Sequence, residues 1–318
     1  MISLGIESTA HTFSIGIVKD KEVLSNVSQM YRPKKGGIVP REAMTHHVEI
    51  AQDILKRALT EAKLSIENVD IISFSAGPGL PPCLRVGSVL ARALGLKYNK
   101  PVVPVNHCVA HVEIAKMTTG FNNPIILYVS GGNTQILGEA GNRYRTFGEA
   151  IDIPIGNCLD QFARELGIPH PGGPTIETLA KSGRWVELPY VVKGMDVSFS
   201  GILTQAIDKF KTGESKENIC FSLQEVCFSM LTEVCERALA HTGKTQLLLT
   251  GGVAANSRLQ KMLQIMCSER NAKFAVVPQE LAGDCGAMIA YTGILARENP
   301  QEKRINRFWR TDDVEIKW

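Results

Sequence analysis

The sequence predicts an α/β fold in which two lobes share one plan. Apolar runs of strand length alternate with longer segments of helical period, which is the pattern of layered sheets and helices. A strand–turn–strand unit appears near the N-terminus and again after residue 124, and a glycine-rich loop follows a later apolar strand. With 318 residues, of which 44% are hydrophobic, the chain has enough apolar material to fill two such cores.

The repeated unit is the most informative element. In its first copy, a strand over residues 2–6 leads into the polar turn Glu7–His11 and a returning strand over 13–18. In its second copy, residues 125–137 enclose the turn Ser130–Asn133. A tight turn of this kind leaves backbone N–H groups that can hold phosphate or carboxylate oxygens, so two such turns facing each other would form a two-sided nucleotide clamp.

A third turn follows the apolar strand at residues 247–250. The turn Gly251–Asn256 precedes a segment that begins as a helix at Ser257, and a helix N-terminus after a glycine pair favours bound anions. A single glycine pair more often serves only to bring strand and helix close together. Three turns at equivalent places resemble the plan of the actin, heat-shock ATPase and sugar-kinase superfamily, the ASKHA fold, which implies a nucleotide cleft between duplicated lobes.

The lobe boundaries follow from the same pattern. Turn residues at Phe121–Pro124 separate the two copies of the repeated unit. We therefore expect an N-terminal lobe over residues 1–120, a C-terminal lobe over 121–302, and a final segment, 303–318, that packs on the first lobe.

Composition narrows the functional classes. The eight cysteines are scattered singly, with no Cys-x-x-Cys pair, which favours reduced thiols over a disulfide framework. The formal charge of +3 is too small to indicate nucleic-acid binding by itself. No apolar run of the sequence approaches the roughly 18 residues that a membrane span needs, so we expect no membrane partner and a cytoplasmic location.

The sharpest local signal is a pair of histidines, His107 and His111. Helical spacing places both imidazoles on one face, one turn apart, where they can share a metal ion. The alternative is two partly exposed or capping histidines, which also arise at this spacing. A zinc peptidase helix would carry glutamate directly after the first histidine, and here that position is Cys108.

The residues around this pair resemble a known family signature. Arg92-Ala93, Tyr98–Pro101, Val103 and the stretch from His107 to Val112 follow the signature of the family first described as O-sialoglycoprotein endopeptidases and now as tRNA threonylcarbamoyl-transferases. The similarity extends over nearly the whole chain, through Gly5–Glu7, Gly36–Pro40, Ser75–Gly79, Val129–Thr134, Pro171–Pro174, Gly251–Asn256 and Gly283-Asp284. The archaeal and eukaryotic branch fits better than the bacterial one, on Gly5–Thr12 and Pro40–Ala43.

The resemblance implies one divalent or trivalent metal ion per subunit, with iron favoured and zinc possible. The family ligands match His107, His111, Tyr128 and Asp284, a mixed nitrogen and oxygen set that suits either metal. Without the resemblance, Tyr128 reads as a buried strand aromatic, and Asp284 reads equally well as the cap of the helix that follows it.

The resemblance also implies an adenine nucleotide site, for threonylcarbamoyl-AMP or for ATP and AMP analogues. Its residues match Tyr128, Val129, Ser130, Gly131 and Gly132 at the phosphate turn, Asp160, Gly173 and Glu177 beside the ribose and adenine, and Asn256 in the glycine loop. Carboxylates accept hydrogen bonds from ribose hydroxyls, and a glycine lets a base approach the backbone. Without the resemblance, both acids read as solvated helix positions.

The implied reaction is metal-dependent transfer of the threonylcarbamoyl group from threonylcarbamoyl-AMP to the exocyclic amine of the adenosine next to the anticodon, in tRNAs reading ANN codons. Glu7 or His11 is the candidate general base, and an alternative role for Glu7 is to orient the turn. For tRNA contacts we expect basic residues such as Lys34, Lys35, Arg41 and Arg85, each of which is also consistent with an ordinary surface charge.

The implied partners, besides tRNA, are those of the KEOPS assembly: a small kinase-like ATPase, a small dimerising subunit and a tRNA-binding subunit. Two other classes of function remain open from the residues. A metallopeptidase needs a metal-bound water and a base, and an ASKHA-type ATPase, scaffold or sugar kinase needs carboxylates placed for magnesium.

Overall fold

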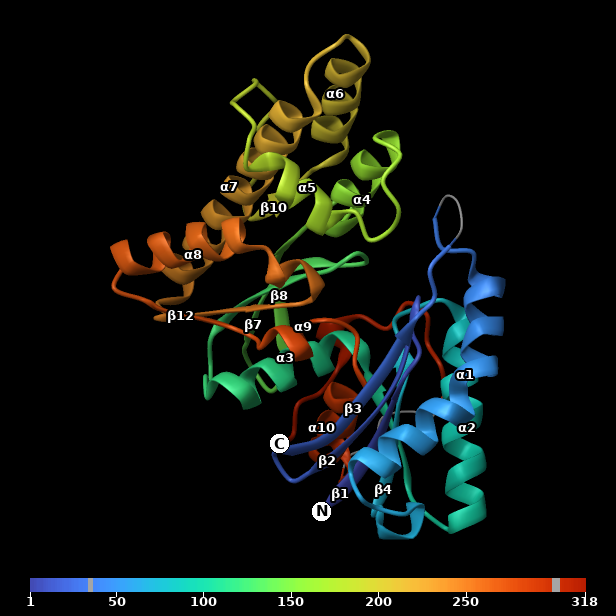
Figure 1. Ribbon diagram of the computed structural model, residues 1–318. Helices are drawn as coiled ribbons and strands as arrows, with labels where there is room; N and C mark the ends of the chain where they lie inside the picture. The colour runs from blue at the N-terminus through green and yellow to red at the C-terminus, as the bar shows by residue number, and fades with distance from the viewer. Residues whose placement is uncertain (34–36, 299–303) are drawn as a thin grey trace. The chain divides into compact units, whose positions relative to one another are not determined.

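The computed structural model (Figure 1) describes residues 1–33, 37–298 and 304–318, so Lys34 and Lys35 lie outside the described residues. The chain divides into two compact units. Unit 1 comprises Met1–Thr118, Ala140–Tyr144 and Gly283–Trp318, and unit 2 comprises Thr119–Glu139 and Arg145–Ala282.

Unit 1 contains a five-stranded mixed sheet with the order β3-β2-β1-β4-β5. The central strand β1 is antiparallel to β2 and parallel to β4. The strands are β1 (Ile2–Glu7), β2 (Thr12–Lys19), β3 (Glu22–Met30), β4 (Ile71–Gly77) and β5 (Val102–Asn106), and the helices are α1 (Pro40–Glu61), α2 (Pro81–Tyr98), α3 (His107–Thr119) and α10 (Gly286–Ala296).

Helices cover both faces of the unit 1 sheet because its side chains alternate between them. Gly5 faces α10 so closely that a Cβ there would lie 2.2 Å from the backbone nitrogen of Ala290, whereas the next residue, Ile6, contacts Gly87 of α2. Glycine is therefore required at position 5 so that the helix can lie against the strand backbone. Since α10 is apolar and buried on nearly every side, it forms the centre of the unit 1 core.

Unit 2 repeats the same sheet, with the order β12-β11-β6-β7-β8. Here β6 is antiparallel to β7 and parallel to β11, just as β1 relates to β2 and β4. The strands are β6 (Ile125–Val129), β7 (Thr134–Glu139), β8 (Tyr144–Glu149), β11 (Gln246–Thr250) and β12 (Lys273–Val276), and the main helices are α4 (Ile155–Glu165), α5 (Gly173–Ala180), α6 (Ser200–Lys211), α7 (Lys216–Thr242) and α8 (Ser257–Glu269). The predicted duplication is confirmed.

Two further sequence expectations can be compared with this architecture. All eight cysteines are free and buried, as the absence of paired spacing indicates. The contact-based units differ from the expected lobe boundaries at the C-terminal side, because residues from Gly283 onward belong to unit 1 rather than to a lobe ending at residue 302. The reason is α10, whose apolar surface is buried against β1 and β2.

Candidate metal and nucleotide sites

The histidine pair stands at the start of α3, where β5 ends. Asn106, the last residue of β5, accepts hydrogen bonds through its side-chain oxygen from the backbone N–H groups of Cys108 (2.9 Å) and Val109 (3.1 Å). This is the capping role that asparagine favours at a helix N-terminus. The cap fixes His107 as the first helical residue, so that His111 follows one turn later on the same face.

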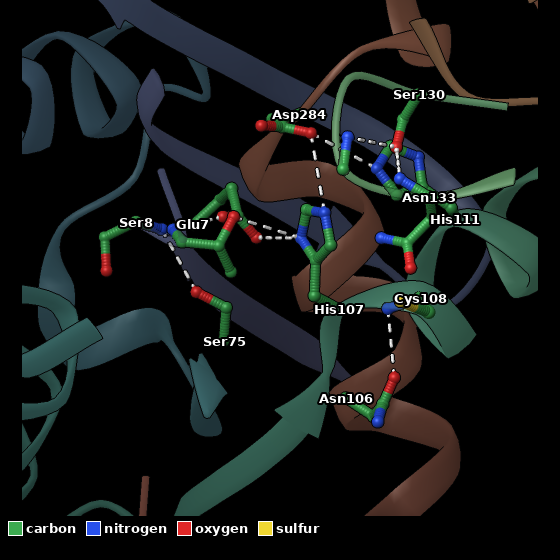
Figure 2. A network of polar contacts seen from close by, with 12 residues as sticks. Glu7, Ser8, Ser75, Asn106, His107, Cys108, His111, Ser130, Asn133 and Asp284 are labelled. Carbon is green, nitrogen blue, oxygen red and sulfur yellow. Dashed lines mark hydrogen bonds and ion pairs between the residues drawn. The ribbon is translucent and has the colours of Figure 1, made fainter. Parts of the chain in front are cut away.

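Three ligand atoms converge beside this helix, all within unit 1 (Figure 2). The Nε2 atoms of His107 and His111 lie 3.5 and 3.3 Å from Oδ1 of Asp284, and the group could hold one metal ion, with its ligand atoms all within 4.8 Å of one another. His107 is nearly buried and His111 is fully buried. Two imidazoles and a carboxylate in this arrangement fit a transition metal with open positions for a further ligand.

Glu7 holds the first histidine from the other side of its ring. Its Oε2 lies 2.9 Å from Nδ1 of His107, and its Oε1 accepts a hydrogen bond of 2.6 Å from the backbone N–H of Thr9. With Nδ1–H donating to Glu7, Nε2 of His107 is the ring nitrogen directed to Asp284, and it offers its lone pair to a metal once its proton leaves. A carboxylate behind a ligating histidine is the usual arrangement for fixing ring orientation and tautomer.

The charges of the group match a cation site. Burial lowers the pKa of His107, but the carboxylates of Glu7 and Asp284 outweigh burial and raise that pKa to about 9. Burial holds the pKa of His111 below its usual value. Burial raises the pKa of Asp284, but the neighbouring His107 and His111 outweigh it and hold that pKa well below its usual range. The two carboxylates thus favour positive charge at the place where the ligand atoms converge.

The turn that carries Glu7 is fixed by three other elements of unit 1. The backbone N–H of Ser8 donates to the Ser75 hydroxyl (3.0 Å), and the N–H of Leu80 donates to the carbonyl of Thr9 (2.8 Å). The fully buried His47, on α1, lies with Nε2 3.1 Å from the carbonyl of Ala10. The sequence-based predictions did not include His47, although a histidine on the buried face of a helix could have indicated a role inside the unit.

The acids of the first turn and of α3, Glu7 and Glu113, are both held by hydrogen bonds to neighbouring groups. Both oxygens of Glu7 are engaged. Glu113, the acid nearest to His111 along α3, accepts a hydrogen bond of 2.5 Å from the hydroxyl of Tyr144, which in turn accepts one of 2.9 Å from Lys116. These contacts give Glu113 a structural role in unit 1.

The second turn, in unit 2, exposes its backbone. The Ser130 hydroxyl accepts from the N–H groups of Gly132 (3.3 Å) and Asn133 (3.0 Å), which shapes the turn, while Gly131 and Gly132 are exposed. A Cβ added at either glycine would meet nothing within 4 Å. Tyr128 and Val129 are fully buried at the end of β6. The ligand role of Tyr128 stays a prediction.

Asp160 organises the loop before α5. Its Oδ1 accepts a hydrogen bond of 2.7 Å from the backbone N–H of Gly172, and its Oδ2 lies 3.1 Å from Nδ1 of His170. Gly173, the first residue of α5, has open space at its Cβ position. The space at Gly173 is consistent with an approaching base, and the ribose contact of Asp160 stays a prediction.

Glu177 and Asn256 meet at the N-terminus of α8. Asn256 caps the helix by accepting from the N–H groups of Arg258 and Leu259, and its side-chain N–H donates to Gln224 (2.7 Å). Glu177 accepts from the backbone N–H of Ser257 at 2.9 Å. The structure therefore brings these two predicted residues of unit 2 together, and both hold the helix end in addition to any nucleotide.

Comparisons with known proteins identify the family of the chain. The TsaD family model, described as tRNA N6-adenosine threonylcarbamoyltransferase, matches residues 22–291. The chain belongs to this family. A relative named tRNA N6-adenosine threonylcarbamoyltransferase from Thermococcus sibiricus is 56% identical over 325 residues, covering all of both chains. Membership of the threonylcarbamoyltransferase family makes the chain a transferase of tRNA modification and confirms the sequence-based assignment.

A second relative is a longer protein. A probable bifunctional tRNA threonylcarbamoyladenosine biosynthesis protein from Methanocaldococcus jannaschii is 52% identical over 325 residues, which cover all of this chain and 60% of that protein. The threonylcarbamoyltransferase described here therefore matches one part of a longer polypeptide in that organism.

Solved structures confirm the fold. Full-length HypF in a phosphate- and nucleotide-bound form has a TM-score of 0.63 at 12% identity, over 93% of this chain and 55% of that chain. A ROK hexokinase from Thermus thermophilus has a TM-score of 0.51 at 16% identity, over 94% of this chain and all of that one. The threonylcarbamoyltransferase thus has the predicted ASKHA-type fold. No described helix is long and apolar enough to cross a membrane.

Proposed function

We propose that the chain transfers the threonylcarbamoyl group from threonylcarbamoyl-AMP to the exocyclic amine of the adenosine next to the anticodon in tRNAs reading ANN codons, and that it does so with one bound metal ion. The observation that carries the metal requirement is the convergence of His107, His111 and Asp284, with Glu7 behind His107. Iron is favoured and zinc is the alternative, with Tyr128 as a further ligand by family resemblance.

A metal held by His107, His111 and Asp284 would supply positive charge to fix the threonyl end of the donor and to polarise its carbamoyl carbonyl. The protein's own contribution is to hold the ligands before the donor arrives. The Asn106 cap and the Glu7 carboxylate restrain His107, and the burial of His111 excludes water from its ring. Such preorganisation removes the need to orient the groups during the reaction.

The adenylate half of the donor is assigned to unit 2. The backbone of the turn at Ser130–Gly132, where Gly131 and Gly132 are exposed, holds the phosphate, and the geometry of that turn, fixed by the Ser130 hydroxyl, supports this assignment. Asp160 and Glu177 accept hydrogen bonds from the ribose hydroxyls, Gly173 leaves room for adenine, and Asn256 closes the glycine loop.

The transfer itself needs orientation more than a protein nucleophile. The adenosine amine is a weak nucleophile because its lone pair is delocalised into the ring, but the donor is already activated, with AMP as the leaving group. Between the two candidate bases, the contacts favour Glu7 as a positioning residue, which leaves the half-buried His11 as the candidate proton acceptor. His11 lies close enough to Asp284 to lower the pKa of that carboxyl.

The proposed setting is the cytoplasm, with tRNA and the KEOPS subunits as partners: the small kinase-like ATPase, the small dimerising subunit and the tRNA-binding subunit. The bifunctional tRNA threonylcarbamoyladenosine biosynthesis relatives support a physical link between this transferase and a second activity of the same pathway. Partners also explain how a chain with a net charge of only +3 can act on RNA.

The test is incubation of the protein, alone and with partner subunits, with threonylcarbamoyl-AMP and unmodified tRNA, followed by digestion and mass spectrometry of the nucleosides. We expect the modified nucleoside from a tRNA reading an ANN codon, and none from the same tRNA with guanosine in place of the adenosine next to the anticodon. Absence of the product even with all partners present would refute the proposal. Isolation of a covalent enzyme-threonylcarbamoyl adduct would refute the direct transfer.

A further inference from the structure

The C-terminal segment Arg304–Arg310, here called the arginine strap, concentrates positive charge within unit 1. Its seven residues include three arginines, at positions 304, 307 and 310, and no acidic residue. All three arginines are exposed, and Phe308 between them is 72% exposed, an unusual state for a phenylalanine. Trp309, which is 9% exposed, turns its side chain into the unit.

The backbone of the arginine strap is fixed in place by the ends of β4 and β5. The N–H of Asn306 donates to the carbonyl of Ala76 (2.7 Å), and the side-chain amide of Asn106 donates to the carbonyl of Trp309 (3.1 Å). The strap lies so close to Gly77 that a Cβ there would be 1.9 Å from the Asn306 carbonyl oxygen. The strap is therefore held by its main chain, while its three arginine side chains are exposed.

These anchors place the arginine strap beside the metal helix of the same unit. Asn106, which holds the carbonyl of Trp309, is the residue directly before His107 and caps α3. Gly79 donates its N–H to the carbonyl of Arg307 (3.4 Å), and the next residue, Leu80, donates to Thr9 in the Glu7 turn. The strap thus shares its anchoring residues with the elements that position the proposed ligands.

The side chains of the strap have the chemistry of an RNA contact. The Arg307 guanidinium lies 4.4 Å from the centroid of the Phe308 ring, which gives an exposed flat surface of mixed cationic and aromatic character. Arginines bind phosphates, while exposed aromatic rings and guanidinium planes stack on unpaired bases, the combination by which single-stranded RNA loops are recognised. Arg310 also pairs with Asp312 at 3.0 Å, which limits its side-chain freedom.

We propose that the arginine strap binds the tRNA substrate, with Arg304, Arg307 and Arg310 on phosphates of the anticodon loop and Phe308 stacked on an unpaired base. This inference deepens the proposed function and rests on it. It gives the transferase an RNA contact of its own, next to its proposed metal ligands. The exposed Arg41 and Arg85, at the beginning of α1 and α2, are further candidate RNA contacts, and the starts of these two helices adjoin through Pro40 and Cys83.

The test compares two double variants of the full-length chain that each lose two positive charges. Arg304→Ala/Arg307→Ala removes strap charges, and Lys19→Ala/Lys21→Ala removes exposed charges from the opposite end of the same sheet, about 23 Å away along β2. Binding of unmodified tRNA is titrated by fluorescence anisotropy at several salt concentrations. We expect the strap variant to bind about tenfold more weakly and to reduce the salt slope by about 1 to 2, and the lysine variant to match wild type.

A single variant separates stacking from charge. Phe308→Ala should weaken binding about tenfold with the salt slope unchanged, and Phe308→Trp should keep wild-type affinity, because stacking depends on the ring and not on counterion release. Metal content and melting temperature, measured on each variant, check that unit 1 remains folded.

The outcomes distinguish the arginine strap from the proposed function. If the arginine and lysine variants lose tRNA affinity and salt slope equally, the proposal that the strap binds tRNA is overturned, even if wild type forms the modified nucleoside. Loss confined to the strap variants supports it. If wild type binds tRNA through the strap but never yields the modified nucleoside, the proposed reaction fails while the RNA surface stands.

Discussion

The two strand–turn–strand units of the molecule have the same topology, but their turns differ in burial and in the residues they carry. In unit 1, the turn after β1 is buried and carries Glu7, whose carboxylate is shared between Thr9 and His107. In unit 2, the turn after β6 is exposed and carries two glycines that leave its backbone open. One copy has thus become a support for side-chain ligands, and the other a backbone surface suited to an anion.

This difference shows how two copies of the same turn can become suited to ligands of opposite charge. A buried carboxylate beside a histidine favours positive charge, whereas exposed amides favour negative charge. In the proposed function, the same hairpin geometry therefore serves a cation in one unit and a phosphate in the other, depending on which atoms the turn presents. The comparison predicts that substitutions in the first unit act on stability or metal binding, and those in the second act on nucleotide binding.

The largest effect is expected from a glycine in unit 1. Gly5→Ala places a methyl group 2.2 Å from the backbone nitrogen of Ala290 and 2.3 Å from the carbonyl oxygen of Gly286, so α10 must shift. We expect a loss of about 3 kcal/mol or more in the free energy of unfolding. Urea denaturation measures it, with Gly131→Ala as the matched control that has open space and should be neutral. Equal stability of the two variants would contradict the close packing of α10.

A pH effect of nearly the same size is expected from His47. Burial lowers the pKa of its imidazole to about 4, against 6.5 in an unfolded chain, while the neighbouring His46 and His11 disfavour its charge and Glu7 favours it. Between these values the unfolded state binds more protons, so stability falls as pH falls from 6.5 to 4, by about 3 kcal/mol in all.

His47→Gln isolates that contribution, because glutamine can still donate to the Ala10 carbonyl but does not titrate in this range. Chemical denaturation at pH 7 and pH 4.5 should show a smaller pH-dependent loss in the variant than in wild type. The same pH dependence in both proteins would show that His47 is charged in the folded state or that other groups dominate.

The third effect separates Glu7 as a positioning residue from Glu7 as a base. Glu7→Ala removes the partner of His107 Nδ1, so we expect the metal affinity of the protein to fall by about 10- to 100-fold. Competition with a chelator, read by metal analysis, measures this without any turnover. Glu22→Gln, at an exposed site at the far end of the sheet, is the control. Wild-type metal affinity in Glu7→Ala would assign the residue to another role.

The smallest effect is expected at the exposed turn of unit 2. Gly131→Ala should leave the melting temperature unchanged, because its Cβ meets nothing within 4 Å, yet the methyl group occupies space beside the proposed phosphate position. We expect about a tenfold weaker affinity for an adenine nucleotide, a loss of about 1.4 kcal/mol. Isothermal titration calorimetry with AMP tests it. Unchanged affinity would remove this turn from the nucleotide site.

Much of the fold was predictable because it depends on short-range patterns of apolar and turn residues that are visible in the sequence. The two hairpins and the apolar strands predict duplicated α/β lobes, and the matching strand orders of the two sheets follow that prediction. The helix α10 was not assignable in the same way. Its residues are apolar on nearly every side, so its sequence has no polar face to indicate which sheet it covers.

The site was predictable only in part. The spacing of His107 and His111 indicates a shared face, but Asp284 is 173 residues from His111 and entered through the family resemblance alone. His47 supports the first turn, and Asn106 anchors the arginine strap, through contacts with backbone carbonyls. Every residue has a backbone carbonyl, so no sequence pattern indicates which one a side chain will contact.

The most direct test of the account is a metal titration of transfer activity. Metal-free protein, with the partner subunits that support turnover, is loaded stepwise with iron or zinc, and the modified nucleoside is quantified by mass spectrometry at each step. We expect activity that rises from near zero and saturates at about one ion per chain in wild type and Cys108→Ala, and that stays near zero in His107→Ala and Asp284→Ala. Full activity of metal-free wild type, or of His107→Ala, would contradict it.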